Sequence, residues 1–160
     1  MSKWTPSVGG RVVEPPRLLY YPDPHSDRMV LGVDHRFEVG GLEVWIPRGY
    51  KWNGASIPRP LWAIIGSRFE PDRLLASLRH DWIYLVHCAD RKSADRLFRD
   101  DLLAAGMAAW KAKTMYSAVR AFGGCSWPTS EADQAEINRV RAMLTERPDR
   151  DKALRTMLVA

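Results

Sequence analysis

The stretch that decides the fold runs from Pro71 to Cys88 and reads PDRLLASLRHDWIYLVHC. A proline at the first position and an acid in the first turn are typical of a helix start, so we predict a helix from Pro71 to about Cys88. At about 100° per residue, its side chains divide into two sectors. One sector is apolar and should face a core, and it contains Leu74, Leu75, Leu78, Trp82, Leu85 and Val86.

The second sector of this helix is polar but carries no Lys, Glu or Arg. A helix face in bulk water usually carries those residues, whereas this one holds side chains that are useful in a site. We therefore predict that the second sector faces a cleft. Its members are Ser77, His80, Asp81, Tyr84, His87 and Cys88.

Three further helices are predicted after this one. The second begins after the N-cap Asp90 and ends at Gly106. The third spans about 108–122, before Gly123-Gly124, and the fourth runs from the capping pair Ser130 and Asp133 to about residue 146.

Asp95 stands out on the second helix because it lies at the edge of an apolar stripe. A carboxylate at the rim of a buried face needs a partner. Counting back from the turn at about 1.5 Å per residue, Asp95 lies nearer the level of Tyr84 and His87 than of His80. A His80–Asp95 pair therefore requires staggered helices. The stripe consists of Ala94, Phe98, Leu102 and Ala105.

The N-terminal third has the pattern of short strands. Apolar runs at 17–21 and 28–33 flank a loop rich in Pro and Asp, and Gly40-Gly41 gives a two-residue hairpin signal before the alternating segment 42–46. We predict a small antiparallel meander, followed by a loop at 49–60 and a short helix at 61–65. The fold class is α+β, with a small N-terminal antiparallel sheet followed by a bundle of about four helices.

Length and composition fit one compact domain. The chain has 160 residues, of which 46% are hydrophobic. We assign 1–10 to an N-terminal arm, 11–146 to the α+β domain and 147–160 to a C-terminal helix or tail. No apolar run approaches the roughly 18 to 20 residues of a membrane span, and the start lacks the apolar region of a signal peptide. We expect Cys88 and Cys125 to be free thiols in a reducing cytoplasm.

The excess of positive charge is local. Residues 91–125 hold seven Lys or Arg against three acids, within a net charge of +5. This segment is either a solvated helix face or a surface for an anionic partner, such as an envelope lipid or a nucleic acid. No nucleic-acid-binding motif is present, and the residues that would contact a nucleic acid in the second case are Lys111, Lys113, Arg120, Trp110 and Tyr116.

The candidate site centres on the His-Asp doublet. His80, Asp81 and Tyr84 place a base, an acid and a phenol in one small volume, and Asp95 completes the catalytic candidates. The polar loop Trp52-Asn53-Gly54-Ala55-Ser56-Ile57-Pro58 supplies the binding candidates Asn53 and Ser56, and the helix supplies a third, His87. The alternative is structural: Asp81 binds loop backbone, His80 is a core histidine, and the network locks the sheet to the helices.

A combination of short segments runs through the middle of the chain: Val44-Trp45-Ile46-Pro47, Gly49-Tyr50, 53–58, His80-Asp81, Tyr84, Ala94-Asp95, Phe98 and 116–119. In this combination the chain resembles a family found largely in phages and prophages, the family with domain of unknown function 1353. That family usually has Asp where this chain has Asn53. The resemblance implies a phage setting and supplies no reaction.

The segment 79–84 also resembles the His-Asp helix of the secreted phospholipases A2, especially the bacterial type. That resemblance implies that His80 deprotonates water, that Asp81 holds Ca²⁺ or another divalent metal, and that Asp95 fixes the imidazole tautomer. The disulfides and a clear Gly-rich calcium loop of those enzymes are absent from this sequence.

Three hypotheses follow. The first is an ester or amide hydrolase centred on His80, with or without a metal, that acts on the host envelope. The second is a non-catalytic phage protein, either a tail or virion accessory subunit or a host-interaction module, made in the host cytoplasm. The third, a metal-dependent phosphohydrolase, needs further His ligands, and the upstream candidate His35 sits in strand-like sequence.

Overall fold

The computed structural model of the chain describes residues 20–53 and 71–145. The N-terminal arm, the predicted helix at 61–65 and the C-terminal segment 147–160 lie outside these residues, as does Ser56. Within them, short antiparallel strands precede a set of helices, so the predicted α+β class is confirmed.

The strands form two small sheets instead of the single meander that we predicted. One sheet has the order β1-β2-β5 and the other is the hairpin β3-β4. Gly49, at φ +86°, turns the chain after β4 so that its N–H donates to the Leu31 carbonyl at 2.6 Å. This turn pairs β5 with β2 in a segment that we predicted to be loop. The strands are β1 (Tyr20–Pro22), β2 (Met29–Leu31), β3 (His35–Val39), β4 (Leu42–Ile46) and β5 (Lys51–Trp52).

The hairpin β3-β4 follows the sequence pattern closely. Gly40 and Gly41 both take positive φ, which a two-residue turn of this kind requires. The alternate residues Val44 and Ile46 are fully buried, and Phe37 on β3 is buried with them. The alternation along 42–46 therefore buries one face of this hairpin, with Leu42 at its end only partly buried.

The helices that follow Asp90 and Ser130 begin where these capping residues predict. Asp90 accepts the Ser93 N–H at 3.0 Å, and Ser130 and Asp133 exchange hydrogen bonds as a capping box. The first helix ends before the predicted Cys88, because His87 takes a left-handed φ of +52°. The elements are α2 (Pro71–Val86), α3 (Arg91–Ala104), α4 (Ala109–Phe122), the 3-10 turn η2 (Gly123–Cys125) and α5 (Glu131–Thr145).

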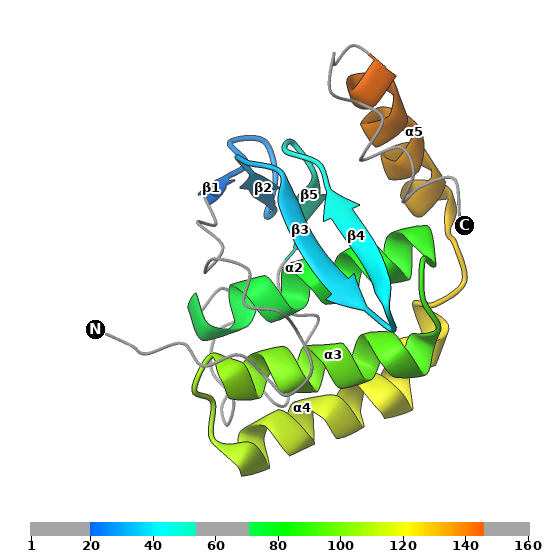
Figure 1. The fold of residues 1–160 in the computed structure, drawn as a ribbon. Coiled ribbons are helices and arrows are strands. Elements are labelled where there is room, and N and C mark those ends of the chain that lie inside the picture. The colour runs from blue at the N-terminus through cyan, green and yellow to red at the C-terminus, as the bar shows by residue number, and fades with distance from the viewer. Residues whose placement is uncertain (1–19, 54–70, 146–160) are drawn as a thin grey trace.

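The helices α2, α3 and α4 lie side by side in sequence order, with the strands on one side of this layer (Figure 1). The apolar sector of α2 is buried against the strands, except that Leu75 is only partly buried. Ala105, which we placed on the α3 stripe, is instead exposed at the helix end. None of the described helices is both long and apolar enough to cross a membrane.

The last helix, α5, projects away from the layer of α2, α3 and α4, although it contacts α2, and it lies beside the strands (Figure 1). Ile137 and Val140 join the main core, and Arg139 donates to the Gly49 carbonyl at 2.9 Å. Glu136 accepts the backbone N–H of Lys51 at 3.4 Å. These contacts hold the start of α5 next to β5, and together the two elements form one side of the site.

Candidate active site around His80

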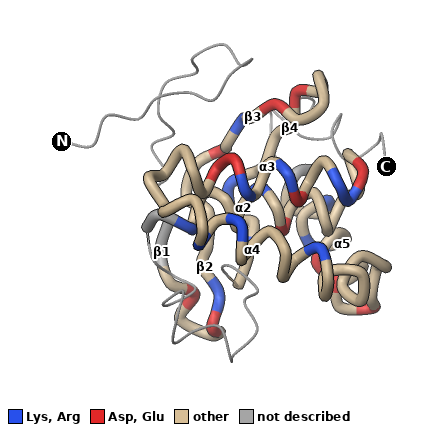
Figure 2. The backbone as a smooth tube through the Cα atoms, turned by 90° about the horizontal axis from the view of Figure 1, so that it is seen from below, with Lys and Arg blue, Asp and Glu red and all other residues tan. Residues whose placement is uncertain are grey.

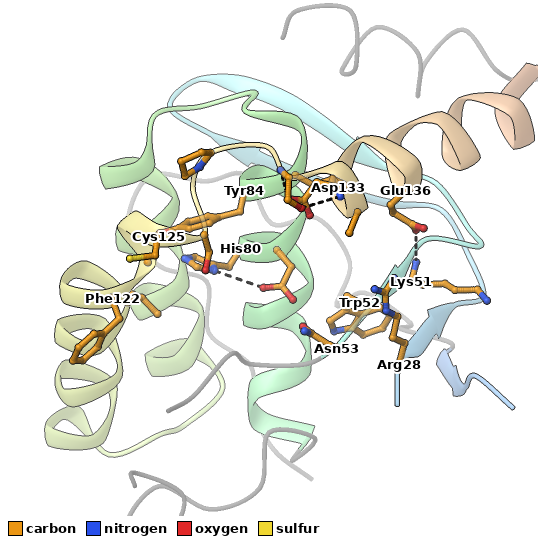
Figure 3. A pocket seen from close by; sticks show the side chains of 18 of the residues that line it. Arg28, Lys51, Trp52, Asn53, His80, Tyr84, Phe122, Cys125, Asp133 and Glu136 are labelled. Atoms are coloured by element: carbon orange, nitrogen blue, oxygen red, sulfur yellow. Dashed lines mark hydrogen bonds and ion pairs between the residues drawn. The ribbon is translucent and has the colours of Figure 1, made fainter. Parts of the chain in front are cut away.

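The polar sector of α2 opens onto a cavity of about 490 Å³, so the predicted cleft is present. His80, Asp81 and Tyr84 line it from α2. The other walls come from β5, the end of α4, the segment after it, and the start of α5. Figure 3 shows His80 and Tyr84 between Phe122 on one side and Asn53 on the other.

Asp95 is the buried centre of the site. Its side chain has no exposed surface, and it contacts side chains from two other helices, His80 on α2 and Arg120 on α4. Its Oδ1 lies 2.8 Å from His80 Nε2 and accepts the Tyr84 hydroxyl at 2.8 Å, while its Oδ2 accepts Arg120 Nη1 at 2.7 Å. The prediction that Asp95 has a partner is confirmed.

The His80–Asp95 pair forms because α2 ends earlier than we predicted. His80 lies six residues before Val86, and Asp95 lies four residues after Arg91. The two levels therefore differ by about 3 Å along the helices, at 1.5 Å per residue, which the imidazole ring can span.

The charge of Asp95 decides the tautomer of His80. Burial raises the pKa of the Asp95 carboxyl, but hydrogen bonds from His80, Arg120 and Tyr84 outweigh burial and bring the pKa below its usual value. An ionised carboxylate only accepts hydrogen bonds, so His80 Nε2 must donate. In neutral His80 the lone pair is therefore on Nδ1.

Asp81 lies on the Nδ1 side of the ring, with its Oδ1 3.8 Å from His80 Nδ1. Burial lowers the pKa of His80, but the carboxylates of Asp81 and Asp95 outweigh this effect, so the pKa is raised above 6.5. Burial raises the pKa of the Asp81 carboxyl, and His80 partly offsets that shift. The free nitrogen of His80 thus faces a second acid at the edge of the cavity.

Tyr84 holds Asp95 in place and is itself held by its neighbours. Its ring packs edge-on against Trp127 at 4.9 Å between centroids and lies 4.2 Å from the His80 ring. Burial and the Asp95 carboxylate raise the pKa of Tyr84 well above its usual value. The phenol therefore stays protonated and remains a donor.

Gly123 leaves the space that the Tyr84 hydroxyl occupies. A Cβ at this position would lie 2.5 Å from that oxygen, whereas a Cβ on Gly124 would have no neighbour closer than 4.0 Å. Because the Tyr84 ring is packed between Trp127 and His80, it has little freedom to move away.

Gly123→Ala should therefore break the Tyr84–Asp95 hydrogen bond and lower the free energy of unfolding by about 1–3 kcal/mol, as expected for a buried acceptor that loses a donor. Urea denaturation measures this loss. Gly124→Ala is the matched control and should change stability by less than about 0.5 kcal/mol. The double variant Gly123→Ala with Tyr84→Phe tests whether the two positions are coupled. If its loss in the free energy of unfolding equalled the sum of the two single losses, the positions would not be coupled as the geometry requires.

The predicted binding residues have different positions. Asn53 is exposed and lines the cavity, while Ser56 lies outside the described residues. His87 does not line the cavity: its Nε2 donates to the Trp127 carbonyl at 2.8 Å, and its ring stacks on the Trp127 ring at 4.5 Å. His87 therefore holds the segment that packs against Tyr84.

Two further residues of the predicted polar sector also lie away from the cavity. Ser77 is buried, accepts Trp52 Nε1 at 3.2 Å and donates to the Leu74 carbonyl. Cys88 is buried, and burial raises the pKa of its thiol to about 11. A thiol with this pKa is a poor nucleophile at neutral pH.

The described residues do not form a donor set for a divalent metal. Among residues 20–53 and 71–145, no three His, Cys, Asp or Glu side chains gather closely enough to hold one. Ca²⁺ prefers six to eight oxygen ligands, and both oxygens of Asp95 already accept hydrogen bonds. Asp81 as a metal ligand is therefore not supported by this part of the chain.

Three of the seven basic residues in the positive segment 91–125 are bonded within the described part of the protein: Arg91, Arg99 and Arg120. Figure 2 shows Lys and Arg interspersed with acids along α3, while α4 carries basic residues only. Arg91 donates to the carbonyls of Val119 and Arg120, at 3.5 and 3.2 Å. Arg120, one of the residues that would contact a nucleic acid if this segment bound one, is the ion-pair partner of Asp95. The sequence gives no signal for this pair, because 25 residues separate its members.

His35 is not part of the site. It lies in β3, as predicted, and its buried Nε2 accepts Arg79 Nε at 3.0 Å. Burial and the neighbouring Arg79 lower its pKa to about 3. His35 is thus a neutral acceptor in the core and supplies no ligand to the His80 centre.

Comparisons with known proteins agree on the central region. The family model described as "Protein of unknown function (DUF1353)" matches residues 32–119, which include Asn53, His80, Asp81, Tyr84 and Asp95. Two proteins of Sinorhizobium fredii are similar: uncharacterized protein y4jT, 40% identical over 94 residues, and uncharacterized protein y4iH, 41% identical over 73 residues. These alignments cover 58% and 46% of this chain but only 28% and 30% of the relatives. No solved structure matches the chain.

Proposed function

The chain belongs to the DUF1353 family of proteins of unknown function, and we propose that its domain is a hydrolase of esters or amides in which His80 activates water. The observation that carries this proposal is the buried Asp95–His80 pair. It fixes the proton on Nε2 and leaves the lone pair of Nδ1 on the side of Asp81, at the cavity. This arrangement is that of a general base oriented by an acid.

The geometry supports a direct attack by water. Water bound at Nδ1 attacks the carbonyl carbon of the substrate while its proton passes to Nδ1. The bond to the leaving oxygen or nitrogen then breaks, and the same proton passes from Nδ1 to the leaving group. Asp95 and Asp81 stabilise the imidazolium that exists between these two transfers.

The raised pKa of His80 predicts the shape of the pH profile. The base must be neutral, so hydrolysis should rise with pH through a pKa above the ordinary histidine value of 6.5. The measurement is turnover between pH 5 and 9 on a panel of 4-nitrophenyl acyl esters, acyl amides and phospholipid vesicles. The vesicles test the resemblance to the phospholipases A2 and the action on the host envelope. No turnover at pH 8 on the panel, or a flat profile, contradicts the proposal.

A second candidate is a non-catalytic phage protein, either a virion or tail accessory subunit or a module that binds the host. The observation that favours it is that Asp95 joins α2, α3 and α4 through one carboxylate, as a structural lock would. The phage setting rests on the family resemblance. Mass spectrometry of purified virions tests the virion role. The variant His80→Gln distinguishes a structural lock, whose loss lowers stability, from a general base, whose loss lowers hydrolysis.

A further inference from the structure

Most charged side chains in the cavity wall already have partners. Lys51 Nζ lies 2.8 Å from Asp23 Oδ2, and this ion pair holds the pKa of Asp23 well below its usual value. Glu136 pairs with Arg139 at 2.6 Å. Asp81 faces His80, and Asp133 accepts hydrogen bonds from Ser130. Each of these charged groups would have to give up a contact within the protein before it could bind a ligand.

Arg28 differs from the other charged residues of the wall. It follows the β1–β2 loop, is exposed, and lines the cavity. In the described part of the chain, no hydrogen bond or ion pair involves its guanidinium group. A guanidinium group presents paired N–H donors that match the two oxygens of a carboxylate or a phosphate. The wall therefore holds a positive charge that an anionic ligand can neutralise.

The wall opposite Arg28 is apolar. Phe122, at the end of α4, lines the cavity and is 65% exposed, which is unusual for so large an apolar side chain. Ala118, Val119 and Pro128 continue this surface. Figure 3 shows Phe122 and Arg28 on opposite sides of the cavity, with His80 and Tyr84 between them. The cavity thus has an apolar side, a reactive centre and a cationic side.

From this arrangement we infer that the cavity binds an amphipathic anion, with its hydrocarbon portion against Phe122 and its carboxylate or phosphate at Arg28. One part of this inference rests on the proposed function, namely that the bound molecule carries the ester or amide bond that His80 hydrolyses. Binding itself needs no catalysis. Arg28 is then the residue that selects substrates by charge.

The test compares three eight-carbon probes that differ only in the head group: octanoate, octyl phosphate and octan-1-ol. Isothermal titration calorimetry measures their binding to the wild type, to Arg28→Gln and to Arg48→Gln. Arg48 is the matched control, because it is exposed, does not line the cavity and also has no side-chain partner in the described part of the chain. Both positions are exposed, so neither change should disturb the fold.

We expect Arg28→Gln to raise the Kd of the anions at least tenfold, and to leave octan-1-ol binding unchanged. Arg48→Gln should bind all three probes as the wild type does, and Phe122→Ala should weaken all three. The anion that binds more tightly identifies the head group. Absence of binding, equal affinity for octan-1-ol and the anions, or equal affinities of Arg28→Gln and wild type would overturn the inference.

The same titrations on His80→Gln separate this inference from the proposed function. If the anions bind His80→Gln and the wild type equally, but no ester is hydrolysed, the binding site stands and the hydrolase proposal fails. If esters are hydrolysed and Arg28→Gln hydrolyses anionic and neutral esters at wild-type rates, the hydrolase stands and the anion site fails.

Discussion

Asp95→Ala should lower the free energy of unfolding by about 3–5 kcal/mol, a large part of the stability of a domain of this size. The carboxylate is fully buried and accepts hydrogen bonds from His80, Tyr84 and Arg120. Its removal takes the acceptor away from three donors at a position where the carboxylate itself is fully buried. Urea denaturation followed by tryptophan fluorescence measures the loss.

The matched control is Asp100→Ala on the same helix. Asp100 pairs with its neighbour Arg99 at 2.7 Å, and its side chain is 41% exposed. A surface ion pair of this kind contributes about 0–1 kcal/mol, so the control should unfold close to the wild type. Equal losses for the two variants would show that Asp95 is not the centre of a buried network.

The pH dependence of this loss gives a second readout. Because the pKa of Asp95 is lowered in the fold, its contribution to stability is present above the unfolded value of 3.8 and is lost as pH falls through the folded pKa. The difference in the free energy of unfolding between Asp95→Ala and the wild type should therefore become smaller below pH 4. The contribution of His80 to stability depends on pH in the opposite direction, because its pKa is raised in the fold. This contribution is fully present below the unfolded pKa of 6.5 and is lost as pH rises through the folded pKa.

The sequence predicts the helices well because local signals define them. Asp90 and the pair Ser130 and Asp133 mark helix starts through bonds to nearby backbone, and the structure shows those bonds. The sheet is predicted less well, because β5 depends on a turn at Gly49 and on a strand 20 residues away. Strand pairing is a long-range property that no local pattern contains.

The candidate site was found because its residues share one helix face. The polar sector of α2 predicts the cavity, and the carboxylate at the edge of an apolar stripe predicts that Asp95 is paired. Arg120 was assigned to a surface, since its partner lies on another helix. Arg28 was missed because an exposed arginine in a loop carries no signal until its place in the cavity wall is known.

His80→Gln should lower kcat/KM for the best ester of the panel by about 10²–10⁴, the range that a general base contributes. Glutamine keeps a polar group of similar size near Asp95 but cannot take a proton from water. His25→Gln is the matched control, because His25 is exposed in the β1–β2 loop and does not line the cavity. Steady-state kinetics at pH 8 measure the change, and circular dichroism verifies the fold.

Asp95→Asn completes the test, because an amide at this position no longer forces the His80 proton onto Nε2. If the two residues act as one unit, the double variant should lose little more activity than His80→Gln alone. Full additivity of the two losses would mean that Asp95 does not act through His80. If instead His80→Gln destabilised the fold strongly and left hydrolysis by the remaining folded protein unchanged, the network would be a structural lock and the base would lie elsewhere.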